Sequence, residues 1–311
     1  MTSAMLTSPA VTVRAPAKVN LELRVGPVRP DGFHPLATVY QAVSLFDEVT
    51  VRASDAWTVS VIGSRALGVP ADATNLAVRA AQALAAAHGI EEPVEILIEK
   101  DIPVAGGMAG GSADAAAALV ACDWLWGLGS SREELAEIGA GLGSDIPFLV
   151  HGGTAIGTGR GEVVTPVLTG GTFHWVFAAA DTGLSTPAVY AEFDRLTEGR
   201  GVAEPTASTG LLTALRSGDA QALAGRLGND LQEAAISLRP ELGELLADGL
   251  SYGALGGIVS GSGPTVAFLA ADHERAIDLA VALTASGTVT HAQRATGPVH
   301  GATVRGVPRA D

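Results

Sequence analysis

The segment from Ile102 to Asp114 carries the clearest chemical pattern in the chain, because four glycines stand between a short apolar stretch and an alanine-rich run. Glycines in such a turn let backbone N–H groups approach an anion without obstruction by side chains. The run from Ala113 to Leu125 favours a helix, whose N-terminus adds partial positive charge. The segment therefore predicts a phosphate-binding turn. Its Ser112 could donate to a phosphate oxygen, help to hold Mg²⁺, or serve only as a helix cap.

Two familiar phosphate motifs are not matched by these glycines. No Gly-Lys-Ser/Thr follows them, and their spacing differs from the G-x-G-x-x-G of dinucleotide-binding folds. A second glycine cluster lies at Gly157 to Glu162, but no helix-forming run follows it. We interpret this second cluster as a strand and a turn with a structural role.

Three charged residues stand in or beside the motif-like segments. The only lysines in the chain are Lys18 and Lys100. Lys18 lies in an extended apolar segment, where burial is costly unless the ammonium meets an anion, although a partly exposed lysine at a sheet edge fits the same pattern. Asp145 lies in a turn between Gly141 and Phe148 and could be a reactive carboxylate or an ordinary turn or cap residue.

Three segments together resemble the motifs of a known family. Pro16–Leu21, Pro103–Ala115 and Gly261–Thr265 have the order and approximate spacing of the three motifs of the GHMP kinases. Further matching segments are Asp31–His34, Gly143–Phe148 and Asn229–Asp230, and the likeness runs from about Val13 to Gly297. The resemblance implies an ATP-dependent small-molecule kinase, with Mg²⁺ held mainly through the ATP phosphates.

The resemblance also assigns roles to the residues around the glycine turn. It implies that Asp145 is the general base and that Lys18 is its electrostatic partner. It places Lys100 near the nucleotide, and it implies that ATP is bound by Pro103, Val104, Ala105, Gly106, Gly107, Met108, Ala109, Gly110, Gly111, Ser112 and Ala113.

Within the family, the segments are most similar to kinases whose alcohol substrate is a methylerythritol linked to cytidine diphosphate. The resemblance implies that Phe33 stacks on the base and that His34 reads its polar edge, although relatives often have tyrosine at position 33. Without the family, Phe33 reads as a buried turn aromatic, His34 as a satisfied polar residue, and Gly261–Gly263 as a tight hairpin. The other implied substrate-binding residues are Asn20, Thr186, Tyr190, Gly261, Ser262 and Gly263.

Two other interpretations stay open. The first is a sibling kinase that acts on homoserine or a mevalonate intermediate, which would not need an aromatic clamp for cytosine. The second is a non-catalytic ligand-binding module on the same fold, although the presence of both Lys18 and Asp145 argues against it.

The elements that must position these residues follow from periodicity and glycine stops. We expect an α+β protein with the two-domain GHMP-kinase fold. Residues 1–166 would form the ATP-binding domain, residues 167–311 would form a ferredoxin-like substrate domain, and the active site would lie in the cleft between them. Expected strands are 11–25, 42–51, 57–62, 94–98, 173–179, 257–260 and 265–269, and expected helices are 75–88, 113–125, one starting at 130 or 131, 188–196, 211–227, 238–250 and 274–285.

Composition limits the partners and the compartment. The net charge of -14 should repel nucleic acid and anionic membranes at long range, so an anionic ligand must be held locally. Cys122 is the only cysteine, which excludes an intrachain disulfide and favours a core position. The sequence has neither a signal peptide nor a long apolar run, so we expect a cytoplasmic protein that is a monomer or a weak homodimer.

Overall fold

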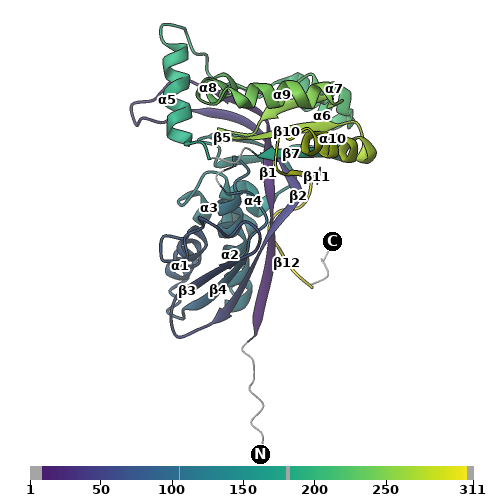
Figure 1. Cartoon of the computed structure of the whole chain (residues 1–311). Coiled ribbons are helices and arrows are strands. Elements are labelled where there is room, and N and C mark those ends of the chain that lie inside the picture. Colours follow the sequence, from purple (N-terminus) through teal and green to yellow (C-terminus); the bar gives the residue numbers. More distant parts are fainter. Residues whose placement is uncertain (1–8, 105, 180–182, 307–311) are drawn as a thin grey trace, which may run out of the picture.

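The computed structural model describes residues 9–104, 106–179 and 183–306, which form two β-sheets with helices packed on each (Figure 1). The first sheet and its helices come mainly from the N-terminal half of the chain. The second sheet and its helices come from the C-terminal half. The predicted α+β fold with two sheets is confirmed.

A long antiparallel hairpin of β1 (Ala10–Val25) and β2 (Leu36–Ala53) forms the spine of the first sheet. The side chains of β1 are almost all buried because both faces of this strand are covered. Its pairing with β2 shifts by two residues between Pro16 and Ala17, where proline has no N–H to donate to the ladder. The other strands are β3 (Thr58–Ile62), β4 (Val94–Glu99), β5 (Thr154–Gly159), β6 (Val163–Pro166), β8 (Gly228–Asn229) and β12 (Thr303–Val304).

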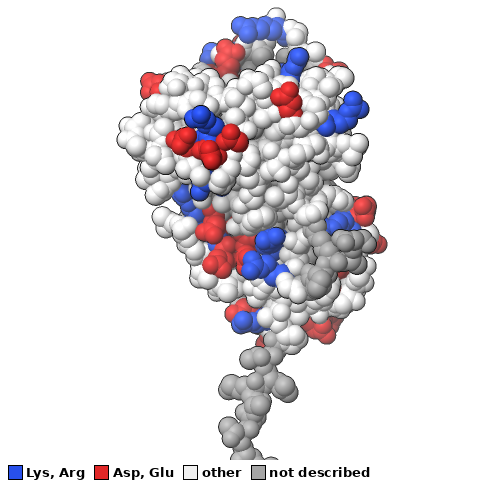
Figure 2. All heavy atoms as spheres, turned by 90° about the vertical axis from the view of Figure 1, so that its right-hand side faces the viewer, with Lys and Arg blue, Asp and Glu red and all other residues white. Residues whose placement is uncertain are grey.

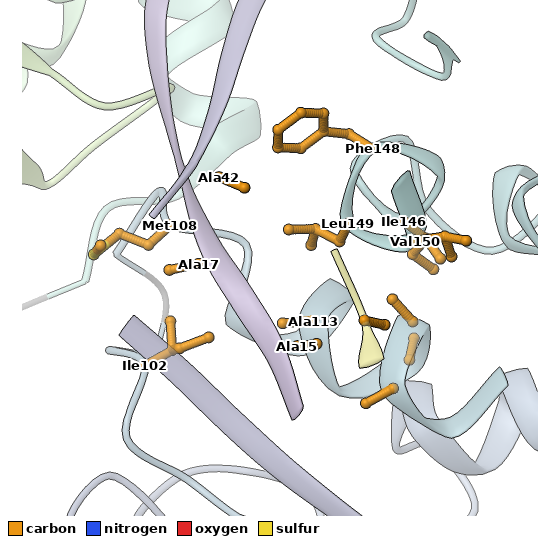
Figure 3. Packing of buried hydrophobic residues seen from close by; sticks show 14 of the residues in the cluster. Ala15, Ala17, Ala42, Ile102, Met108, Ala113, Ile146, Phe148, Leu149 and Val150 are labelled. Atoms are coloured by element: carbon orange, nitrogen blue, oxygen red, sulfur yellow. The ribbon is translucent and has the colours of Figure 1, made fainter. Parts of the chain in front are cut away.

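Four helices accompany this sheet: α1 (Leu76–His88), α2 (Gly110–Trp126), α3 (Arg132–Ala140) and α4 (Ile146–His151). The alanines of α2 allow its backbone to approach β1 and β2 closely. Figure 3 shows Ala113 at the start of α2 beside the small residue Ala15 of β1. α3 begins with a capping box at Ser131, as its sequence predicts.

The second sheet has the strand order β11-β7-β10-β9 and is antiparallel throughout. In chain order these strands are the first (β7, Phe173–Ala179), second (β9, Gly256–Val259), third (β10, Thr265–Ala270) and fourth (β11, Ala292–Gly297), so the order is 4-1-3-2. This is the ferredoxin-like βαββαβ arrangement that was expected. The helices are α5 (Thr186–Thr197), α6 (Thr209–Ser217), α7 (Ala220–Ala224), α8 (Gln232–Leu238), α9 (Glu241–Ser251) and α10 (His273–Ala285).

Several element boundaries differ from the predicted ones. The helix predicted over 211–227 is divided into α6 and α7, because the left-handed Gly218 ends α6 and Asp219 caps α7. The helix predicted over 238–250 starts only after Pro240. Strand β2 begins six residues before the predicted Ala42. The strands β6, β8, β11 and β12 and the short helices α4 and α8 have no counterpart among the predicted elements.

The two halves of the chain are joined by more than the connecting segment at 167–172. β8 and β12 come from the C-terminal half but pair with β1 of the first sheet. The indole nitrogen Nε1 of Trp175 on β7 donates to Oε1 of Gln41 on β2 at 2.9 Å. The division into domains at residue 166 stays a prediction.

Charged side chains are sparse and mixed on the face of the molecule shown in Figure 2, where acidic and basic groups lie close together and uncharged residues cover most of the surface. None of the helices in the described ranges has the length and hydropathy needed to cross a membrane.

Candidate active site

A cavity of about 830 Å³ lies where the glycine turn, the start of α4, the β1–β2 loop and α5 meet. Its volume is typical of small-molecule sites. Both halves of the chain contribute to its walls. The first half supplies Lys18, Asn20, Phe33, His34, Tyr40, Gly106, Gly107, Ala109, Gly110, Gly111, Ser112, Ser144, Asp145 and Arg160, and the second supplies Leu184, Thr186, Tyr190, Asp194, Leu231, Gly261, Ser262 and Gly263, among others.

The N-terminus of α2 opens into this cavity. Ala109 precedes the helix in the left-handed conformation, with φ of 61°, and within the described structure no side chain caps the helix start. The first backbone N–H groups of a helix have no partner inside the helix. Gly110, Gly111 and Ser112 form that first turn and line the cavity, so their amides can donate to an anion bound there. Ser112 is inside the helix and is not its cap.

Two neighbouring chain segments hold the glycine turn in place. The backbone N–H of Lys18 donates to the carbonyl oxygen of Met108 at 3.2 Å, and the hydroxyl of Ser260 donates to the carbonyl oxygen of Gly107 at 3.0 Å. Gly107 has φ of 72°, and a Cβ at this position would collide with the backbone carbonyl of Ser260. Glycine is therefore required where the two loops touch.

Lys18 is buried at the floor of the cavity. Its ammonium donates to Oδ1 of Asn20 at 2.5 Å, and the amide of Asn20 in turn donates to the hydroxyl of Thr38 at 2.8 Å. Burial lowers the pKa of Lys18, and the charge of Asp145 opposes that shift. Lys18 is therefore not the partly exposed lysine at a sheet edge that its sequence also allowed. It is buried in the fold and interacts with the charge of Asp145.

Asp145 occupies the position before α4, but within the described residues its carboxylate makes no capping hydrogen bond to that helix. The side chain lines the cavity instead, together with the start of α2. Its influence extends to two tyrosines. Burial raises the pKa of Tyr40 well above its ordinary value, and the charge and hydrogen bonding of Asp145 raise it further. Burial and the same charge raise the pKa of Tyr190 to about 12. Both phenols therefore stay protonated beside the carboxylate.

The β1–β2 loop places Phe33 and His34 at the other end of the cavity. The residue Phe33 is 52% exposed, and the guanidinium carbon of Arg160 lies 5.3 Å from the centroid of its ring. His34 is buried: its Nδ1 lies 2.8 Å from the carbonyl oxygen of Gly26, and its Nε2 lies 3.4 Å from Oδ1 of Asp194. Its ring also stacks on Tyr190 at 5.3 Å between centroids. Phe33 is thus the ring left open to a ligand, while Tyr190 reaches the cavity beside His34.

The loop from Gly261 to Gly263 closes the cavity from the second half of the chain. The side-chain amide of Asn229 donates to the carbonyl oxygens of Val259 at 2.8 Å and Gly261 at 2.7 Å. The hydroxyls of Ser262 and Thr186 lie 2.8 Å apart. A Cβ on Gly261 would lie 3.3 Å from both the Nζ of Lys18 and the Oδ1 of Asn20, which shows how closely this loop covers them.

Some predicted nucleotide-binding residues lie behind the cavity wall. Lys100 is 1% exposed and makes ion pairs with Asp47 and, at 3.0 Å, with Asp114 of α2. The side chains of Pro103, Met108 and Ala113 are buried too, and Val104 is exposed outside the lining. Ala105 lies outside the described residues. The buried residues of this set support the turn from behind, and direct contact of any of the set with ATP stays a prediction.

Sequence reasoning did not find Tyr40, Ser144, Arg160 or Asp194. Tyr40 reaches the cavity from the middle of β2 and stacks on Phe148 of α4 at 4.9 Å between centroids. The only feature of the sequence that could have indicated Tyr40 as a site residue is its position on the strand that follows the Asp31–His34 loop. Arg160 stood in a segment to which only a structural role was assigned.

The fold and the site define the class of protein. The family model for the GHMP kinases N terminal domain matches residues 75–153, and the model for the GHMP kinases C terminal domain matches residues 211–288. The chain belongs to the GHMP kinases, a family of kinases that use ATP.

Several individual proteins and solved structures are similar to this chain over most of its length. A 4-diphosphocytidyl-2-C-methyl-D-erythritol kinase of Streptomyces avermitilis is 60% identical over 295 residues, which are 95% of this chain and 99% of the relative. The enzyme of that name from Salinispora tropica is 55% identical over 296 residues, 94% of each chain. A crystal structure of 4-(cytidine 5'-diphospho)-2C-methyl-D-erythritol kinase has a TM-score of 0.75 at 31% identity and covers 92% of this chain and 98% of its own. A homoserine kinase from Cytophaga hutchinsonii, at 20% identity and a TM-score of 0.74 over 98% and 99%, shares the fold.

Proposed function

We propose that the chain transfers the γ-phosphoryl group of ATP to the 2-hydroxyl of 4-diphosphocytidyl-2-C-methyl-D-erythritol, giving the 2-phosphate and ADP in the non-mevalonate route to isoprenoid precursors. The observation that carries the proposal is one cavity lined by the uncapped start of α2, by Asp145 and Lys18, and by the exposed ring of Phe33. Relatives up to 60% identical over nearly the whole chain bear the name of this kinase.

The reactive end of the cavity would need few side chains. Asp145 would accept the proton of the substrate hydroxyl as its oxygen bonds to the γ-phosphorus. The charge of Asp145 opposes the lowering of the Lys18 pKa by burial, and the ammonium of Lys18 would offset negative charge at the transferred group. Amides at the start of α2 would stabilise the charge that moves onto the leaving diphosphate.

The glycine turn fits an ATP phosphate chain. The amides of Gly110, Gly111 and Ser112 open into the cavity, and Gly107 can have no side chain there because of Ser260. A third feature is Thr265, whose hydroxyl is buried without a hydrogen-bond partner in the described structure and lies 2.8 Å from the position of a Cβ on Gly106. Thr265 thus places a polar atom directly against the turn, so close that a side chain at Gly106 would collide with it.

Magnesium would depend mainly on the phosphate oxygens. Among the residues that the structure describes, no group of three or more His, Cys, Asp and Glu side chains could hold a metal ion. Among the protein side chains, we assign the hydroxyl of Ser112, which lies in the first turn of α2 and lines the cavity, to the ion. When bound, Mg²⁺ would neutralise charge on the β- and γ-phosphates.

The nucleotide end of the substrate would lie against Phe33. An aromatic face stacks on any base, and the polar groups of His34, Thr186 and Asp194 lie at the edges of this part of the cavity. Because Nδ1 of His34 lies 2.8 Å from a backbone carbonyl, its Nε2, now 3.4 Å from Asp194, is the atom that can meet the base. The loop Gly261–Gly263 would close over the methylerythritol and Asn20.

The substrate is tested by coupled ADP release with ATP and Mg²⁺, comparing 4-diphosphocytidyl-2-C-methyl-D-erythritol with homoserine and mevalonate. We expect ADP release only with the cytidylyl compound. Faster release with homoserine or mevalonate would assign the chain to a sibling kinase. No release with any of the three would support a ligand-binding module without catalysis. The cytoplasmic location and the monomeric or weakly dimeric state stay predictions.

A further inference from the structure

The turn between β5 and β6 is part of the cavity wall, although its sequence suggested only a structural role. Arg160 in this turn lines the cavity. The next residue, Gly161, has φ of 106°, and a Cβ there would collide with the hydroxyl of Tyr40. The turn is therefore packed directly on a residue that feels the charge of Asp145, and its position relative to the site is fixed.

Arg160 is placed so that its guanidinium can meet a ligand. The guanidinium lies above Phe33, and its side chain is 41% exposed. Glu162 holds the turn by accepting a hydrogen bond from the backbone N–H of Arg160 at 2.5 Å, while the ion pair between the two side chains is long, at 3.8 Å. A guanidinium has five N–H donors, and one long ion pair occupies few of them.

The charges along the cavity show where a second cation is needed. Lys18 lies at the reacting end, hydrogen-bonded to Asn20 and near Asp145. At the Phe33 end, the charged groups that line the cavity are the carboxylate of Asp194 and the guanidinium of Arg160, which is the single arginine in the lining formed by described residues. A dianionic ligand would be repelled by Asp194 and by a net charge of -14 unless a local cation met it.

We propose that Arg160 binds the diphosphate that links the cytidine to the methylerythritol and is therefore a specificity-determining residue of this cavity. The proposal rests on the proposed substrate, which carries its diphosphate between the group stacked on Phe33 and the group that reacts at Asp145. Arginine is suited to this contact because its planar fork donates two parallel hydrogen bonds to phosphate oxygens. On binding, Arg160 exchanges its long ion pair with Glu162 for the phosphate.

The test compares ligands that differ only in phosphate content. Binding of cytidine, cytidine monophosphate and cytidine diphosphate is measured by calorimetry for the unaltered chain, Arg160→Gln and Arg160→Lys. We expect Arg160→Gln to weaken cytidine diphosphate binding roughly 10- to 100-fold, as for the loss of a hydrogen bond between charged groups, and to leave cytidine unchanged. Arg160→Lys keeps the charge and should recover part of the loss.

A matched control is Arg195→Gln, which removes the same charge from an exposed position on α5 outside the cavity lining. It should leave all three affinities unchanged, and ATP binding to Arg160→Gln should match that of the unaltered chain. An equal loss for cytidine and cytidine diphosphate would place Arg160 at the base and overturn the proposal, as would an unchanged affinity for cytidine diphosphate. Because these measurements need no turnover, they are independent of the ADP-release test of the proposed function.

Discussion

Phe33 combines two properties that are seldom found together in a loop: a large aromatic ring and half-exposure at the mouth of a cavity. The carboxylate of Asp31 accepts a hydrogen bond from the backbone N–H of Phe33 at 3.0 Å and also pairs with Arg29, so the loop is ordered without burying the ring. The ring of Phe33 is therefore accessible to a ligand and contributes little to the hydrophobic core. A stacking role is therefore favoured over the alternative of a buried turn aromatic.

Substitution of Phe33 by alanine should weaken binding of the cytidylyl substrate and spare ATP. Loss of one base–aromatic stack costs about 1–3 kcal/mol, so we expect the KM of the cytidylyl substrate to rise roughly 5- to 150-fold. The KM of ATP should stay within about twofold. Val28→Ala is the matched control, because Val28 is an exposed apolar residue of the same loop that does not line the cavity. Equal changes in both KM values would exclude the stacking role.

Individual site residues could be predicted from the sequence where they belong to a family motif. Lys18, Asn20 and Asp145 lie at the predicted end of the cavity because motif and fold agree there. Tyr40 and Asp194 could not be found in the same way, since their approach to the site depends on how β2 and α5 are placed by long-range packing. For Lys100, a clear position in the motif did not predict the place of the side chain. Two buried carboxylates hold its ammonium away from the cavity.

Helix α2 depends on a buried charge cluster beneath its first turn. The ammonium of Lys100 pairs with Asp47 and Asp114, and Oδ1 of Asp47 accepts hydrogen bonds from the backbone N–H groups of Asp101 at 2.7 Å and Ile102 at 2.9 Å. The cluster thereby ties the end of β4 to the start of α2 on both sides of the glycine turn. Figure 3 shows Ile102 and Met108 packed beside β1 in the same region.

One lysine between two buried aspartates has a consequence for stability. Burial raises the pKa of Asp114 to about 8, against the opposing charge of Lys100 and with the help of Asp47. In the unfolded chain an aspartate titrates near 4, at about 3.9. Between these values the folded protein binds more protons than the unfolded chain, so this residue lowers the free energy of unfolding as the pH rises from about 4 to about 8.

Asp114→Asn should remove that dependence. The free energy of unfolding of Asp114→Asn, relative to the unaltered chain, should increase with pH by up to about 1.4 kcal/mol per unit across this window. Urea unfolding at pH 5.5, 6.5 and 7.5 measures the difference. Asp278→Asn, at an exposed position of α10, serves as the control and should show no comparable trend. A difference that is constant with pH would show that Asp114 is ionised in the folded protein.

Element boundaries were predictable where a local signal marks them. The helix at 76–88 ends at the left-handed Gly89, and α3 starts at the capping box of Ser131. By contrast, α2 starts at Gly110 and not at the predicted Ala113, so two glycines stand in its first turn despite their low helix propensity. β12 is only two residues long and exists through its pairing with β1, which no local pattern reveals.

The molecule as a whole builds its site from segments that are distant in sequence. β8 and β12 of the second half complete the first sheet, and Ser260 bonds to the glycine turn across 153 residues. The family motifs predicted that these parts meet, and the ferredoxin-like order of the second sheet was predicted with them. Strand pairing over such separations is decided by the packing of whole layers, which explains why β8, β11 and β12 were missed.

The central claim is that the start of α2 binds the ATP phosphates while Asp145 acts as the general base in the same cavity. The turnover number of Asp145→Asn tests this claim most directly. With ATP and 4-diphosphocytidyl-2-C-methyl-D-erythritol both saturating, we expect kcat for ADP release to fall at least about 100-fold, as for loss of a general base. Calorimetric affinities for ATP and for the cytidylyl substrate should stay within a few-fold. A kcat close to that of the unaltered chain would contradict phosphoryl transfer with Asp145 as the base.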